Sequence, residues 1–115
     1  MQMMTIYHNP RCSKSRQTLG LLEENGRDFV VKEYLKNPPT VDELKKVIRL
    51  LGIKPIDLLR KGEPEFKENF KGKDLSDDEW VKAMVEYPKM IERPIVIDGD
   101  HAVIGRPPEN VLKLL

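Results

Sequence analysis

The residue best suited to chemistry in this sequence is Cys12, the one cysteine of the chain. It directly precedes a segment of helical composition, where unpaired backbone N–H groups and the helix dipole stabilise an anion. Arg11, Lys14 and Arg16 add positive charge beside it, and His8 lies shortly before it. The thiolate is the nucleophilic form of cysteine, and each of these features favours it. We therefore expect an activated nucleophile rather than an inert core cysteine, with the same backbone groups seating an anionic substrate.

Three other uses of this cysteine fit the sequence less well. A structural zinc site needs about four ligands, and beside His8 the only other histidine is His101, which we expect next to a turn. Tyrosine-phosphatase chemistry needs a longer spacing between cysteine and arginine than the one from Cys12 to Arg16. Ser15 stands where a dithiol redox motif has its second cysteine. We therefore expect no metal site, and any disulfide at Cys12 must be made with another molecule.

The elements expected around the cysteine form a β-α-β unit. An apolar strand over residues 4–7 is followed by the turn signal Asn9-Pro10, and a helix is expected over residues 13–25. A second strand is expected within residues 28–34. The connection between the strands is short, so a right-handed crossover predicts that they are parallel.

The C-terminal part of the sequence predicts a β-β-α arrangement. Residues 95–97 and 102–104 are apolar runs separated by Asp98-Gly99-Asp100, which is a strong hairpin signal. Pro107-Pro108 is suited to the first turn of a last helix. The residues of that helix expected to face inward are Val111, Leu112 and Leu115.

A helical block is expected between these two halves. Thr40 and Glu43, and again Ser76 and Glu79, have the spacing of a capping box, and apolar residues follow each pair at helical spacing. Residues 53–75 predict only a short helical turn at 55–59. The whole pattern predicts an α/β protein with a mixed four-stranded sheet: one thioredoxin-like domain over residues 1–115, with a helical insertion at about 40–90.

Composition excludes several classes of protein. The 115 residues include 20 Lys and Arg against 19 Asp and Glu, and 39% are hydrophobic. This near balance argues against a nucleic-acid-coating protein, and the hydrophobic content is neither that of a disordered chain nor that of a membrane protein. The N-terminal residues lack the pattern of a signal peptide. With one free thiol, which suits a reducing compartment, we expect a cytoplasmic protein without a membrane or nucleic-acid partner.

Five ordered segments resemble the glutaredoxin-dependent arsenate reductase family, and together they span nearly the whole chain. They are residues 8–16, 34–39, 58–61, 92–96 and 105–108. The family has a thioredoxin-like fold with a helical insertion, which agrees with the order of elements above. Ser13-Lys14 replaces the Gly-Thr that commonly follows the cysteine, and the resulting run resembles the arsenate-reductase-like branch. We therefore expect this chain to share the thiol chemistry of the family more closely than its choice of oxyanion substrate.

The resemblance assigns roles to individual residues. Cys12 would be the nucleophile, His8 would help to lower its pKa, and Ser15 would support the thiolate by hydrogen bonding. Pro94 would be the cis-proline that faces the cysteine, with Arg16 as a second supporting residue. The oxyanion-binding residues implied are Arg60, Arg93 and Arg106.

The resemblance also implies the partners. The thiolate of Cys12 would attack arsenate, glutathione would act as co-substrate, arsenite would leave, and glutaredoxin would restore the thiol. No bound cofactor is expected, and we expect a monomer. Two alternatives stay open: a thiol oxidoreductase with another substrate, and an Spx-type regulator that binds RNA polymerase. Ser15 in place of a second cysteine and the set of arginines favour the enzyme.

Overall fold

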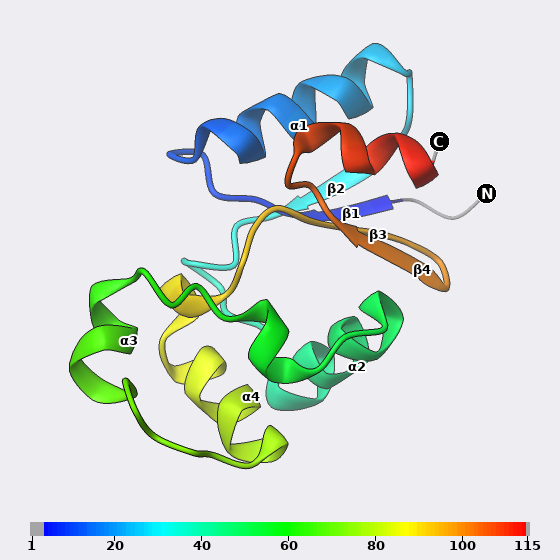
Figure 1. Cartoon of the computed structure of the whole chain (residues 1–115). Coiled ribbons are helices and arrows are strands. Elements are labelled where there is room, and N and C mark those ends of the chain that lie inside the picture. Colours follow the sequence, from blue (N-terminus) through cyan, green and yellow to red (C-terminus); the bar gives the residue numbers. More distant parts are fainter. Residues whose placement is uncertain (1–3, 115) are drawn as a thin grey trace. The chain divides into compact units, whose positions relative to one another are not determined.

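The computed structural model describes residues 4–114, and the chain divides into two compact units (Figure 1). The sheet unit comprises Met1–Asn37 and Arg93–Leu115, and the helical unit comprises Pro38–Glu92. The two halves predicted from the sequence therefore form one unit, and the predicted helical block forms the other.

The sheet unit contains the predicted mixed four-stranded sheet. Its strands are β1 (Met4–Tyr7), β2 (Phe29–Lys32), β3 (Ile95–Asp98) and β4 (His101–Ile104). They lie in the order β2-β1-β3-β4, with β1 parallel to β2 and antiparallel to β3, and with β3 and β4 forming the predicted hairpin. Gly99 in the hairpin turn has a φ of 62°, a conformation that favours glycine.

Two helices cover one face of this sheet: α1 (Ser13–Glu24) and the 3₁₀ helix η3 (Pro108–Leu114) (Figure 1). The core between helices and sheet is built from Met4, Ile6, Leu22, Val96 and Val111. Val111 is buried as predicted, but the prediction for Leu112 is wrong, since it is 47% exposed. With three residues per turn, Val111 and Leu114 share a face and Leu112 points elsewhere. Leu115 lies outside the described residues.

The helical unit follows the two predicted capping boxes. Its elements are α2 (Val41–Leu51), η1 (Pro55–Leu58), α3 (Pro64–Asn69), α4 (Asp77–Glu86) and η2 (Pro88–Met90). Thr40 caps α2 and Ser76 caps α4, each with the reciprocal bonds of a capping box. Among residues 4–114, no helix has both the length and the apolar character needed to cross a membrane.

Helix α3 was not expected, because the sequence Gly62-Glu63-Pro64 has the composition of a break. Pro64 instead occupies the start of the helix, where its missing N–H costs nothing. Phe66 and Phe70 place their rings 6.1 and 5.9 Å from the ring of Trp80. These tertiary contacts hold a segment whose own sequence gives little helical signal.

Candidate active site

Cys12 is the N-cap residue of α1 and is 8% exposed. The turn before it is fixed by Asn9, whose side-chain oxygen accepts a hydrogen bond from the Arg11 N–H at 3.1 Å and whose carbonyl accepts one from the Cys12 N–H at 3.0 Å. Arg16 reaches back to donate to the Pro10 carbonyl at 2.9 Å. The predicted turn therefore holds Cys12 at the start of α1.

The surroundings of the Cys12 sulfur favour its anionic form. Burial raises the pKa of the thiol, but hydrogen bonds from the backbone N–H groups of Ser15 and Lys14, together with the hydrogen bond and positive charge of Arg93, lower the pKa below its ordinary value. Nη2 of Arg106 also donates to the Cys12 Sγ at 3.4 Å. A helix N-terminus and two guanidinium groups thus meet at one sulfur atom.

The two arginines are placed by the ends of neighbouring strands. Arg93 precedes β3 through a cis peptide bond to Pro94, as the resemblance implied, and Arg106 follows β4. The Gly105 N–H donates to the Pro94 carbonyl at 2.8 Å, and Arg106 Nε donates to the Arg93 carbonyl at 2.9 Å. A Cβ on Gly105 would lie 2.6 Å from Thr18 Oγ1, so this close approach requires glycine.

His8 and Ser15 contact each other directly. Nδ1 of His8 lies 2.6 Å from Oγ of Ser15, and the same hydroxyl accepts a hydrogen bond from the Asn9 N–H at 3.0 Å. Ser15 is fully buried. Its hydroxyl therefore ties the turn to the helix, while the hydrogen bond that Ser15 gives to Cys12 comes from its backbone.

The imidazole of His8 is biased towards its neutral form. Burial is the largest influence and lowers its pKa, the Glu33 carboxylate raises it, and Arg16 lowers it; the pKa lies below the ordinary value of 6.5. Near neutral pH His8 is therefore uncharged. Its suggested effect on the acidity of Cys12 stays a prediction.

Arg60 belongs to the helical unit. Its Nε lies 3.4 Å from Oε1 of Glu63, and its Nη1 lies 3.7 Å from Oε1 of Glu92. The Arg60 N–H also donates to the Met90 carbonyl at 2.8 Å, which fixes the backbone at this point. Its guanidinium is thus shared between two carboxylates of its own unit, and its place in an oxyanion site stays a prediction.

His101 lies at the start of β4, exposed and opposite Asp98. Within the described part of the chain, His, Cys, Asp and Glu side chains form no group of three or more that could hold a metal ion.

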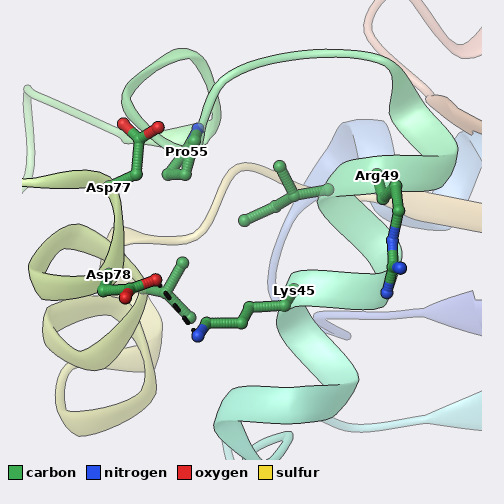
Figure 2. A pocket seen from close by; sticks show the side chains of 7 residues that line it. Lys45, Arg49, Pro55, Asp77 and Asp78 are labelled. Atoms are coloured by element: carbon green, nitrogen blue, oxygen red, sulfur yellow. Dashed lines mark ion pairs between the residues drawn. The ribbon is translucent and has the colours of Figure 1, made fainter.

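A separate hollow of about 380 Å³ lies in the helical unit between α2, η1 and α4 (Figure 2). Ile48 and Val81 line it, and Lys45 pairs with Asp78 across it at 3.1 Å. Its lining also includes Arg49, Pro55 and Asp77.

Sequence reasoning did not single out two residues that position the site, Asn9 and Gly105. The signal for Asn9 was present in the Asn9-Pro10 turn, and Gly105 stands in the segment 105–108 that carries part of the resemblance. Their roles depend on contacts with Arg11, Thr18 and Pro94, and the contacts to Thr18 and Pro94 join distant parts of the sequence.

The sheet order, the helix that starts at a cysteine and the cis-proline before β3 define a thioredoxin-like protein with one cysteine at the start of its first helix. The family model for the ArsC family matches residues 7–114. The chain therefore belongs to the ArsC family.

Relatives with known names support the same family. The chain is 47% identical to an arsenate reductase of Haemophilus influenzae over 96% of this chain and 97% of the relative. It is 40% identical to an arsenate reductase of Escherichia coli K12 over all of this chain and 82% of the relative. The solved structure of an arsenate reductase from Vibrio cholerae matches with a TM-score of 0.91 and 47% identity, covering 99% of this chain and all of that one.

Proposed function

We propose that this chain reduces arsenate to arsenite, with Cys12 as nucleophile and glutathione as reductant. The observation that carries the proposal is the convergence of Arg93, Arg106 and the N-terminus of α1 on the Cys12 sulfur. The arsenate reductases of Haemophilus influenzae and Escherichia coli, at 47% and 40% identity, support arsenate as the substrate.

Binding and attack use the same positive groups. Arsenate carries about two negative charges at neutral pH, and planar guanidinium groups bind such oxyanions through paired hydrogen bonds. The Cys12 thiolate attacks arsenic, a sulfur–arsenic bond forms, and an arsenic–oxygen bond breaks. The departing oxygen takes up protons and leaves as water. Arg93 and Arg106 offset the negative charge that gathers on the remaining oxygens during this step.

Reduction then requires two electrons from outside the chain. The glutathione thiolate attacks the Cys12 sulfur, a disulfide forms, and the sulfur–arsenic bond breaks with its electron pair left on arsenic. Arsenic falls from the +5 to the +3 state and departs as arsenite. A glutaredoxin thiol then takes the glutathione from Cys12 by exchange, which restores the thiolate. The cycle needs no bound cofactor, and it suits the reducing conditions of the cytoplasm.

The proposal is tested by arsenate-dependent NADPH consumption in the presence of glutathione, glutaredoxin and glutathione reductase. Turnover should be lost in Cys12→Ser. Arg106→Ala should lower kcat/KM for arsenate by about 100-fold, the loss typical of one preorganised donor to an oxyanion. Arg49→Ala is the matched control, because it removes an exposed arginine of α2 in the helical unit; it should leave turnover unchanged.

The departure at Ser13-Lys14 makes the choice of oxyanion a separate question. Phosphate, selenate and arsenate should therefore be compared as substrates or inhibitors in the same assay. A folded protein with a reactive Cys12 that turns over another oxyanion but not arsenate would contradict arsenate as the substrate while keeping the thiol chemistry.

A further inference from the structure

Asn110 lies in η3, four residues after Arg106, and its side chain bridges two carbonyl groups. Nδ2 donates to the Ile104 carbonyl at 3.2 Å and to the Arg106 carbonyl at 2.9 Å. A side-chain amide nitrogen has two hydrogens, so each carbonyl receives one. Both partners are acceptors, which identifies the NH₂ group as the end that faces them. The amide therefore fixes the backbone on both sides of Gly105.

The backbone held in this way carries the guanidinium that contacts the nucleophile. Arg106 Nε donates to the Arg93 carbonyl at 2.9 Å, and Nη2 donates to the Cys12 Sγ at 3.4 Å. The guanidinium is planar and presents its donors in a fixed fork. Once Nε is bonded to Arg93, the direction of Nη2 depends on where the Arg106 backbone lies.

Contacts of Gly105 hold the middle of this segment, and Asn110 holds the carbonyl groups on either side of it. The Gly105 N–H donates to the Pro94 carbonyl at 2.8 Å, and the glycine packs against Thr18. Both contacts are made by residue 105 alone, whereas Asn110 bonds the carbonyls of residues 104 and 106.

We propose that Asn110 is a positioning residue that aims the Arg106 guanidinium at the Cys12 sulfur and at an oxyanion bound there. The part that concerns the oxyanion rests on the proposed function; the part that concerns Cys12 does not. A hydrogen bond weakens steeply when its geometry is lost, and a misplacement of about 1 Å in a reacting site can reduce the rate by about 100-fold.

The test is the rate of Cys12 alkylation by iodoacetamide as a function of pH, in the full chain and without arsenate. Asn110→Ala should raise the apparent pKa of the thiol, because the Arg106 contact that favours the thiolate is loosened. Asn110→Ser keeps one donor and should shift the pKa less in the same direction. Asn25→Ala is the matched control, since it removes an amide hydrogen bond of the same kind, to the Leu21 carbonyl at 2.7 Å, at the end of α1; it should leave the pKa unchanged.

The double variant separates positioning from a merely structural role. In an Arg106→Ala background, Asn110→Ala should add no further shift in the alkylation profile, because the group through which it acts is gone. A full additional shift in that background would overturn the proposal. So would an unchanged profile in folded Asn110→Ala, or, where that variant does not fold, in folded Asn110→Ser.

Arsenate kinetics provide a second measurement, which tests the part of the proposal that concerns the oxyanion. Asn110→Ala should raise KM for arsenate by about tenfold, as expected for a weakened binding contact. Absence of arsenate turnover in the unaltered chain would contradict the proposed function, whereas the alkylation profile would still decide the role of Asn110.

Discussion

Gly105→Ala should destabilise the chain through steric conflict alone. The φ of Gly105 lies outside the left-handed region, so alanine can adopt its backbone conformation. The added Cβ would lie 2.6 Å from Thr18 Oγ1 and 2.8 Å from Pro94 Cγ. Neither neighbour moves easily, because the Thr18 hydroxyl donates to the Lys14 carbonyl at 2.9 Å and the proline ring is rigid.

The magnitude follows from two opposing effects. Overpacking a filled site costs about 1–3 kcal/mol, while replacing glycine by alanine stabilises by about 0.4–1 kcal/mol through the unfolded state. From the centres of these two ranges, the free energy of unfolding should fall by about 1.3 kcal/mol, and by about 2.6 kcal/mol at most. Gly20→Ala in α1 is the matched control, since nothing lies within 4 Å of its added Cβ; in a helix it should stabilise by about 0.5–1 kcal/mol.

The two variants should be compared by guanidinium denaturation followed by circular dichroism. Opposite shifts of the unfolding midpoint at a constant slope are expected. In Gly105→Ala the iodoacetamide profile of the thiol should also move, because Arg106 is the next residue. A Gly105→Ala protein as stable as the unaltered chain, with an unchanged alkylation profile, would refute the close packing described at this junction.

Three further outcomes are expected. Arg93→Ala should raise the pKa of the Cys12 thiol, measured by alkylation across pH, because it removes a hydrogen bond and a positive charge from the sulfur. Thr40→Ala should lower the stability of the chain by about 1 kcal/mol in urea denaturation, the usual cost of losing an N-cap. The lowered pKa of Cys12 implies a stabilisation that is full above the ordinary thiol pKa of about 8.5 and is lost as pH falls through the folded-state value. The stability difference between the unaltered chain and Cys12→Ser should therefore grow with rising pH, and a difference that does not change with pH would contradict the lowered pKa.

Local signals predicted most of the secondary structure. The hairpin around residues 98–100 and the capping boxes at Thr40 and Ser76 depend on residues close in sequence, and the structure confirms them. Helix α3 could not be predicted in the same way, because its stability comes from aromatic contacts with Trp80. Leu112 was placed wrongly because the last helix is 3₁₀ rather than α.

In the site, too, local features could be predicted from the sequence, and contacts between distant residues could not. The position of Cys12 at a helix start could be predicted from the neighbouring sequence alone, whereas its contact with Arg106 joins residues at opposite ends of the chain. The hydrogen bond between His8 and the Ser15 hydroxyl likewise depends on where the first strand ends relative to the helix. The spacing of residues in the sequence does not predict such contacts. For the arginines, the prediction of a role in oxyanion binding came from the family resemblance.

If Cys12 carries the electrons from glutathione to arsenate, the intact mass of the protein after one turnover should change. The chain is mixed with arsenate and glutathione in the absence of glutaredoxin and then quenched with acid. We expect a mass increase of one glutathione at Cys12 that requires arsenate, is removed by glutaredoxin and matches the arsenite released. Arsenite release without this adduct, or an adduct that forms equally without arsenate, would contradict it.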